Sequence, residues 1–288
     1  MLISENEFLP EPGVPIFFRR EYIGLHGGTY YQLVENGKAL TGIWLKDGRS
    51  PGRSPFGGLS QKIRADLAYE FLQEFALKHG LREVVLPPCD HDLEHAAIQI
   101  NALSRLGFQM TPDLNYSVSI DSRTLVECMD EGNRKKLEKC RAAGFRTCDL
   151  QRGSWGAAHA VLTASRERHG RTLSMTFEDV LRLERAFPDG VITYHGVFAG
   201  DTLIAAALVL DITPAICYVY AWGDSEKNEY APTVMLADEI YARCRSRQVK
   251  IVDVGTSTEN GIPHLGVIRF KRSLGFRGSL KATMRVGA

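Results

Sequence analysis

The two halves of this chain carry the same order of strands and helices, and this repeat constrains the fold more than any single motif. In the first half, aromatic and β-branched runs at 15–24, 28–36 and 115–121 predict strands, and apolar spacing at 63–78 and 92–106 predicts helices. Strands that alternate with helices pack as sheets with helices on their faces. The first half therefore predicts one α/β domain.

The second half starts this order again near residue 150. Apolar spacing predicts helices, and alternation predicts strands, over these segments: helices 157–169, 177–187, 234–247 and 262–276; strands 191–200, 201–212, 215–224, 250–257 and 281–286. At about 150 residues per domain, the 288 residues suit two domains, 1–150 and 151–288. We expect mixed sheets in both, with the last strand packed back on the first domain.

Composition restricts the partners and the compartment. The net charge of +1 gives no global attraction to DNA or to an anionic membrane. The longest apolar run, 203–210, is too short to span a bilayer, and the N-terminus lacks the basic region of a secretory signal. The six cysteines form no CxxC pair and no zinc-finger spacing. These features predict a cytoplasmic protein with free thiols.

Several segments resemble, in order and spacing, the Fem-type peptidoglycan bridge aminoacyltransferases of the GNAT superfamily. They are NRKKLEKCRAAGF (133–145), VLTASRERHG (161–170) with Thr163 and Arg166 in matching places, IVDVGTS (251–257) and VIRFKRSLGF (267–276). The N-terminal third matches in layout alone, with SPFGG (54–58) where the family has a glycine-containing strand end. The resemblance implies two tandem GNAT-like acyltransferase domains and an aminoacyl group taken from tRNA.

The chain departs from the wider superfamily at the loop that binds the pyrophosphate of acetyl-CoA. There, backbone N–H groups and a helix dipole stabilise the phosphates, and glycines allow close approach. The corresponding segment, 223–236, has no glycine after Gly223 and carries Asp224, Glu226 and Glu229. Fixed negative charge beside a phosphate is unfavourable. The sequence therefore does not support an ordinary acetyl-CoA site, and the Fem-type enzymes also lack this loop. This chain has no room for the long helical hairpin that several Fem-type members carry, so their donor and acceptor do not transfer directly to it.

Lys271 is the leading catalytic candidate. It lies with Arg269, a substrate-binding candidate, beside the apolar face of the last predicted helix and near its start. Acyl transfer to an amine builds an oxyanion, which a nearby lysine stabilises. The resemblance also places substrate against this lysine. The alternative is a solvated lysine on a helix.

Asp253 and His264 are candidate acid–base partners. Asp253 lies on an apolar strand, where a charge needs a partner. His264 precedes the last helix, and an imidazole can act as a general base. The alternatives are a structural Asp253, paired with Arg269 or capping a turn, and an exposed loop histidine.

Tyr218, Tyr220 and Trp222 alternate along one predicted strand, which places all of them on one face. They either line an acceptor cleft as substrate-binding residues or belong to the core.

A loop in the first half is a second candidate binding site. Its cations are Arg49, Arg53, Lys62 and Arg64, and its small residues include Ser54, Gly57 and Gly58. Backbone amides together with arginines suit a phosphate group, such as the diphosphate of a nucleotide sugar. The alternative is a surface loop kept soluble by its charge.

Two further patterns have a functional and a structural interpretation. Cys89, His91 and His95 include an i, i+4 histidine pair that can chelate zinc, but no third ligand follows at a known spacing. The basic run of the polar helix expected at 122–143 is either a solvated face or a contact for RNA phosphates. We expect no metal and no tightly bound cofactor.

Together these features predict transfer of an aminoacyl or acyl group to an amine of a cell-wall or surface-polysaccharide precursor. The donor would be aminoacyl-tRNA or acyl-CoA, and the acceptor a nucleotide-sugar or lipid-linked precursor. One alternative is an acetyl-CoA-dependent N-acetyltransferase, which micromolar acetyl-CoA binding would reveal. Another is a non-catalytic ligand-binding protein that keeps the fold. A lack of thermal stabilisation by all acyl donors and nucleotide sugars would favour this alternative.

Overall fold

The computed structural model describes residues 2–5, 13–51, 54–187, 190–225, 230–259 and 261–287. Contacts divide the chain into two compact units. The first comprises Met1–Asn115, Thr256–His264 and Gly278–Ala288, and the second comprises Tyr116–Gly255 and Leu265–Arg277. These units follow packing, whereas the division near residue 150 followed the sequence repeat, and that division stays a prediction.

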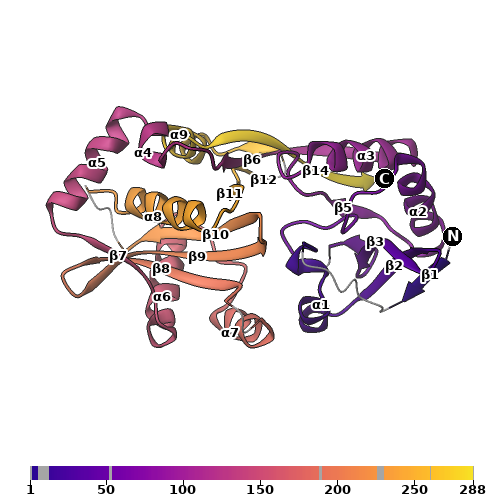
Figure 1. Ribbon diagram of the computed structural model, residues 1–288, viewed down its shortest axis with the longest axis horizontal. Helices are drawn as coiled ribbons and strands as arrows, with labels where there is room; N and C mark the ends of the chain where they lie inside the picture. Colours follow the sequence, from indigo (N-terminus) through magenta and orange to yellow (C-terminus); the bar gives the residue numbers. More distant parts are fainter. Residues whose placement is uncertain are drawn as a thin grey trace. The chain divides into compact units, whose positions relative to one another are not determined.

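The first unit contains strands from both ends of the chain (Figure 1). An antiparallel sheet is formed by β1 (Leu2–Glu5), β2 (Thr29–Glu35) and β3 (Lys38–Leu45). Further strands are hydrogen-bonded in the order β4 (Arg49–Ser50), β5 (Glu83–Val85), β14 (Arg277–Val286) and β6 (Phe108–Ser119). A separate hairpin pairs β12 (Thr258–Glu259) with β13 (Ile262–Pro263). The last strand, β14, runs antiparallel to β5.

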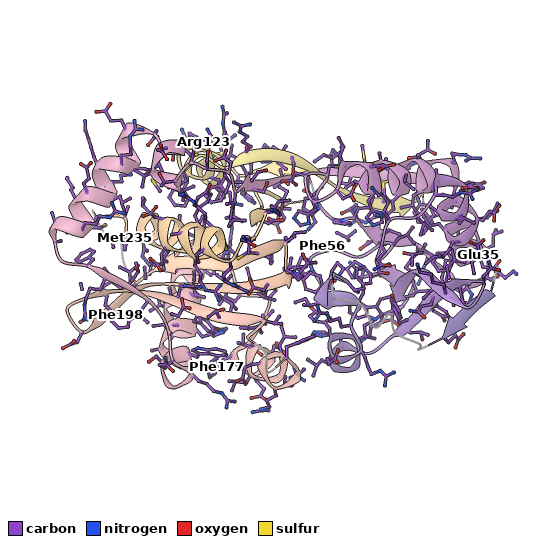
Figure 2. All side chains as sticks on the ribbon, in the orientation of Figure 1. Glu35, Phe56, Arg123, Phe177, Phe198 and Met235 are labelled. Atoms are coloured by element: carbon purple, nitrogen blue, oxygen red, sulfur yellow. The ribbon has the colours of Figure 1, made fainter. Side chains whose placement is uncertain are left out.

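Helices α2 (Ala65–Lys78) and α3 (Leu93–Arg105) pack into the core of this unit. The predicted strand at 15–24 is wrong: the segment forms the 3-10 helix η1 (Ile16–Phe18) and α1 (Arg20–His26). Its aromatic residues suggested a strand, but Phe18 and Tyr22 are four residues apart and both are buried, which is a helical spacing. Phe56, labelled in Figure 2, is also buried and packs edge-to-face against Phe17.

In the second unit, the later part of β6 begins a series of hydrogen-bonded strands. The order continues through β11 (Ile251–Thr256), β10 (Ile216–Asp224), β9 (Thr202–Thr213), β8 (Ile192–Ala199) and β7 (Arg146–Asp149). The helices are α4 (Leu125–Cys128), α5 (Glu131–Ala142), α6 (Trp155–Glu167, after η2, Arg152–Ser154), α7 (Phe177–Ala186), α8 (Thr233–Ser246) and α9 (Leu265–Ser273). The helix expected over 122–143 is divided because Asp130 caps α5 by accepting the Asn133 N–H.

Helices α8 and α6 cover opposite faces of the strands β8 to β10 (Figure 1). Val234 and Ile240 of α8 pack with Cys217 and Val219 of β10 in the main core cluster. On the other face, a Cβ built on Gly223 would meet Ser165 of α6 at 2.4 Å, so the sheet and α6 are in close contact there.

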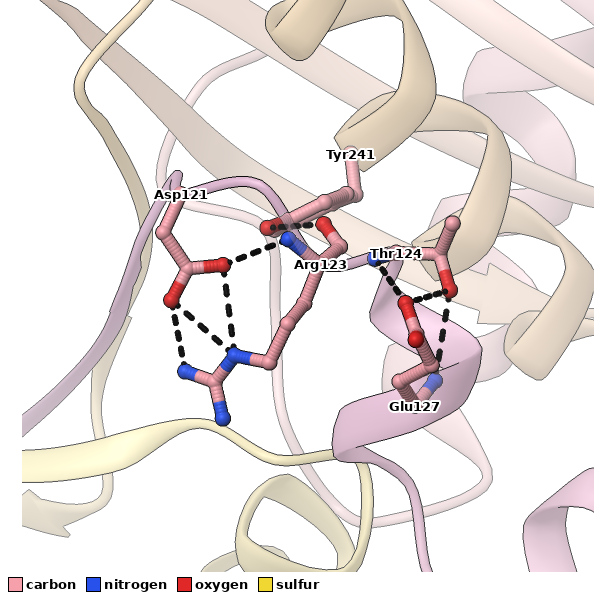
Figure 3. A network of polar contacts seen from close by, with 5 residues as sticks. All are labelled: Asp121, Arg123, Thr124, Glu127 and Tyr241. Atoms are coloured by element: carbon pink, nitrogen blue, oxygen red, sulfur yellow. Dashed lines mark hydrogen bonds and ion pairs between the residues drawn. The ribbon is translucent and has the colours of Figure 1, made fainter.

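A polar network fixes the chain between β6 and α4 (Figure 3). The Asp121 carboxylate pairs with the Arg123 guanidinium at 2.6 Å, and the Arg123 carbonyl accepts the Tyr241 hydroxyl of α8 at 3.1 Å. Thr124 and Glu127 then form a capping box at the start of α4. These bonds join the chain that leads into α4 and α5 to α8.

Thr176 caps α7, and the cap gives a measurable contribution to stability. Its hydroxyl accepts the Asp179 N–H at 3.1 Å, and the Asp179 carboxylate accepts the Thr176 N–H at 2.9 Å. We expect Thr176→Ala to lower the free energy of unfolding by about 1 kcal/mol in urea denaturation. Thr172→Ala, in the exposed loop before α7, should leave it unchanged. Equal effects of both substitutions would contradict the capping assignment.

Candidate active site

The strands β10 and β11 run side by side and then separate, and the separation creates the candidate site. Their parallel pairing covers Ile216–Tyr218 and Ile251–Asp253. Beyond Tyr218, β10 continues along β9, whereas β11 turns at Gly255, whose φ of +75° favours glycine. Ligand sites in α/β proteins lie at the carboxyl ends of parallel strands. Chemically reactive side chains of the second unit gather at this end of β10 and β11.

Lys271 is buried at this point, with 3% of its surface exposed. Its Nζ donates to the Gly255 carbonyl at 2.8 Å and lies 5.7 Å from the centre of the Tyr116 ring. Burial lowers the pKa of Lys271 to about 7, against the opposing effect of the Asp253 charge. The alternative of a solvated lysine is therefore wrong, because Lys271 is buried. The expected place near the helix start is also wrong, because Lys271 lies in the last turn of α9.

Asp253 is 1% exposed and braces the turn that receives Lys271. Its Oδ1 accepts the Gly255 N–H at 2.7 Å, so one residue, Gly255, is bonded by both side chains. The negative charge of Asp253 raises the pKa of Lys271 and so favours the ammonium form. This hydrogen bond agrees with one alternative given above, in which Asp253 caps a turn. Arg269, by contrast, is exposed on α9.

His264 belongs to the first unit, whereas Asp253 and Lys271 belong to the second. Its Nε2 lies 3.6 Å from the Glu259 carboxylate, and its backbone N–H donates to the Ser257 carbonyl at 2.9 Å. The acid–base pairing of His264 with Asp253 stays a prediction.

The prediction that the strand's aromatic residues share one face is wrong. The register of β10 against β9 shifts between Val219 and Ala221, so Tyr220 is an extra residue in a β-bulge. Alternation restarts after the bulge, which turns Trp222 to the α8 face with Val219. There Trp222 packs edge-to-face against Phe270 at 5.7 Å. Trp222 is therefore partly buried against the main core cluster, and its substrate-binding role stays a prediction.

Tyr218 and Tyr220 lie on the other face, with ring centres 6.5 Å apart. The Tyr220 hydroxyl is 2.5 Å from the Ser174 hydroxyl. Both tyrosines are close enough to Arg166 of α6 to affect its pKa. They are half-buried, so each ring lines the site with part of its surface.

Arg166 is a further candidate site residue, which the sequence analysis matched to the Fem-type segment but did not assign to the site. Burial lowers its pKa, and the Arg171 charge lowers it further. Within the described parts of the chain, its guanidinium forms no hydrogen bond and no ion pair. Its own charge lowers the pKa of Lys271, so these cations are neighbours. The sequence did contain a signal for its position. Arg166 follows Trp155, His159 and Leu162 at helical spacing, which places it on the inward face of α6.

The loop proposed to bind phosphate uses its polar groups within the first unit. The N–H groups of Gly57 and Gly58 donate to the Val85 carbonyl and to the Ser50 hydroxyl. The Ser54 hydroxyl donates to the Phe56 carbonyl at 2.7 Å. The nearby cations pair with carboxylates: Arg49 with Glu83, Lys62 with Glu94 and Arg64 with Asp66. Arg53 lies outside the described residues. Phosphate binding by this loop stays a prediction.

The histidines of the possible zinc pattern have other contacts. His95 Nε2 lies 3.0 Å from the Leu59 carbonyl and 3.1 Å from the Gln99 side chain. The His91 ring contacts Phe56. Asp92 caps α3 by accepting the His95 N–H. Among the residues that the structure describes, no group of three or more His, Cys, Asp or Glu side chains has a geometry that could hold a metal ion.

Comparison with known proteins places the fold. No protein-family model matches the chain, and no curated protein matches it. The chain is similar in structure to FemX, with a TM-score of 0.70 and 11% identity over 99% of this chain and 97% of that one. It is also similar to L-PGS from Bacillus licheniformis (TM-score 0.58, 12% identity, 87% and 82% covered) and to a GNAT-family acetyltransferase from Colwellia psychrerythraea (TM-score 0.54, 9% identity, 99% of both chains covered).

At sequence identities this low, the similarity shows the fold alone. None of the described helices has the length and apolar composition needed to cross a membrane. The predicted mixed α/β fold is confirmed, and the chain has a Fem-like GNAT fold.

Proposed function

We propose that the protein is an acyltransferase that transfers an aminoacyl or acyl group to an amine of an anionic cell-wall or surface-polysaccharide precursor. The observation that carries this proposal is the burial of Lys271 where β10 and β11 separate. The Fem-like fold supports the reaction class, and the cationic surroundings support an anionic substrate.

The proposed reaction begins when the acceptor amine attacks the carbonyl carbon of the donor ester or thioester. The carbonyl oxygen then becomes an oxyanion, which the Lys271 ammonium stabilises from a site that excludes water. Collapse of this intermediate, with transfer of a proton from the amine nitrogen to the leaving oxygen or sulfur, releases the alcohol or thiol of the donor and forms the amide. Asp253 and the Gly255 carbonyl hold Lys271 in place, so the donor and acceptor need only be positioned. No tightly bound cofactor is required for these steps.

Arg166 would bind the anionic group of the acceptor. A half-buried guanidinium without a hydrogen bond or ion pair among the described residues is costly, and a phosphate or carboxylate would satisfy it with charge-assisted hydrogen bonds. Tyr218 and Tyr220 beside it supply ring surface and hydroxyl groups. Nucleotide-sugar and lipid-linked precursors both carry phosphates, which matches this site.

A transfer assay tests the proposal directly. Purified protein is supplied with a mixture of labelled aminoacyl-tRNAs or with labelled acetyl-CoA, and with amine-bearing nucleotide-sugar precursors. Amide formation from aminoacyl-tRNA supports the proposal. Transfer from acetyl-CoA alone would instead identify a CoA-dependent N-acetyltransferase. An absence of transfer, together with no thermal stabilisation by any donor or nucleotide sugar, would favour a ligand-binding protein.

Substitution of Arg166 should separate binding from catalysis. We expect Arg166→Ala to raise KM for the anionic acceptor about ten- to hundredfold with little change in kcat, because the lost interaction is a charged hydrogen bond present before and during reaction. Arg166→Lys should recover part of the loss. Arg245→Ala, which removes an exposed arginine on α8, should behave as wild type. An unchanged KM in Arg166→Ala would refute the anion-binding role.

A further inference from the structure

The segment between α6 and α7 contacts the last residues of β10 and is fixed at both ends. At its start, the Arg168 guanidinium donates to the Asp224 carbonyl at 2.6 Å and pairs with the carboxylate of the same residue at 2.7 Å. Gly170, whose φ of +66° favours glycine, then turns the chain away from α6. At the other end, the Thr176 capping box begins α7. Residues 170–175 between these anchors are named the strap.

The Tyr220 side chain of β10 holds the strap against the sheet. Its hydroxyl lies 2.5 Å from the Ser174 hydroxyl. Burial raises the pKa of Tyr220, and hydrogen bonds with the Ser174 hydroxyl and the Met175 N–H oppose this rise. Within the described part of the chain, no backbone-to-backbone hydrogen bond involves residues 172–175. Because side-chain bonds replace a backbone ladder here, the strap can open locally while the rest of the second unit stays folded.

The strap also brings a second arginine to Arg166. The Arg171 N–H donates to the Arg166 carbonyl at 3.0 Å, and both residues are half-buried. Across the residues that the structure describes, neither guanidinium forms a hydrogen bond or an ion pair. Like charges held close together repel each other, so the closed strap is unfavourable by itself. An anion that accepts hydrogen bonds from both groups reverses this effect.

We propose that Arg171 is a second binding residue for the anionic group that Arg166 binds, and that the strap closes on this group and is held by the bond between Ser174 and Tyr220. The inference rests on the proposed function, which places the anion of the acceptor at Arg166. Two guanidinium groups suit a ligand with two negative charges. The diphosphate that nucleotide-sugar and lipid-linked precursors share has this chemistry.

Hydrogen exchange of the Met175 N–H, followed by NMR at constant ionic strength, tests the strap without acyl transfer. Inorganic pyrophosphate is the probe. At saturation it should slow this exchange about three- to tenfold in wild type, because a bound anion reduces the open population. Without pyrophosphate, Ser174→Ala should exchange about three- to tenfold faster than wild type, although Tyr220 is still present to accept the Met175 N–H. Arg171→Ala should bind pyrophosphate about tenfold more weakly and show no slowing at saturation.

The matched control is Arg245→Ala, which removes an exposed arginine on α8 and should keep the wild-type affinity and slowing. A nucleoside diphosphate that slows Met175 exchange at a lower concentration than pyrophosphate supports the proposal with a nucleotide-sugar acceptor, and equal effects support it with a lipid-linked one. Pyrophosphate binding that Arg166→Ala abolishes, but that leaves Met175 exchange unchanged in wild type, would overturn the strap and leave the proposed function standing. An absence of pyrophosphate binding by wild type would overturn both the strap and the anion-binding role of Arg166.

Discussion

Lys271→Ala is expected to lower kcat about 10²- to 10³-fold, which corresponds to about 2.7–4 kcal/mol of lost transition-state stabilisation. The reason is that the Lys271 ammonium is held at the carboxyl end of β10 and β11 by the Gly255 carbonyl and the Asp253 charge. An oxyanion exists only during the reaction, so KM should change little. Steady-state kinetics with the donor and acceptor identified by the transfer assay provide the measurement.

Three further variants make this result interpretable. Lys271→Met keeps most of the side-chain volume, so it separates loss of charge from loss of packing if Lys271→Ala folds poorly. Lys271→Arg keeps the charge but moves it, and should recover only part of the activity. Arg272→Ala changes an exposed neighbour in the same helix and should be fully active. Full activity in a folded Lys271→Met protein would exclude a catalytic role for this lysine.

The same burial predicts that Lys271 destabilises the protein at neutral and acid pH. Its pKa is about 7 in the folded protein and 10.5 when exposed. Below about pH 7 both states are protonated, and the full cost of the buried ammonium applies. Between pH 7 and 10.5 the unfolded state binds more protons, so the free energy of unfolding rises with pH by up to about 1.4 kcal/mol per unit. We expect Lys271→Met to lack this rise.

Urea denaturation of wild type and Lys271→Met from pH 6 to 9.5 measures this difference, because other titrating groups are common to both proteins. The free energy of unfolding of the variant, relative to wild type, should be highest below pH 7 and should decline as pH rises. Across this range the decline should be about 3 kcal/mol. Lys250→Met, at an exposed lysine, should give a flat difference. A flat difference for Lys271→Met would mean that Lys271 keeps an ordinary pKa and is not buried.

Local patterns determined much of the fold of the second half. The alternation along 191–200 and 215–224 predicted β8 and β10, and the spacing at 177–187 predicted α7. These elements were predictable because their signals lie within a few residues: side-chain period, cap and turn. The segment at 15–24 failed for the opposite reason. Its aromatic residues fit a strand or a helix, and packing in the first unit selected the helix.

The sequence by itself determined the α/β class, most elements of the second half and the candidacy of Lys271, Asp253 and Tyr218. Tertiary structure decided which of these chemical groups are buried and which contact one another. A bulge at Tyr220 turned Trp222 toward the main core cluster, and burial changed Lys271 from an ordinary helix lysine to one with a pKa of about 7. Hydrogen bonding within a strand or helix is local, whereas burial and charge pairing depend on residues far apart in sequence.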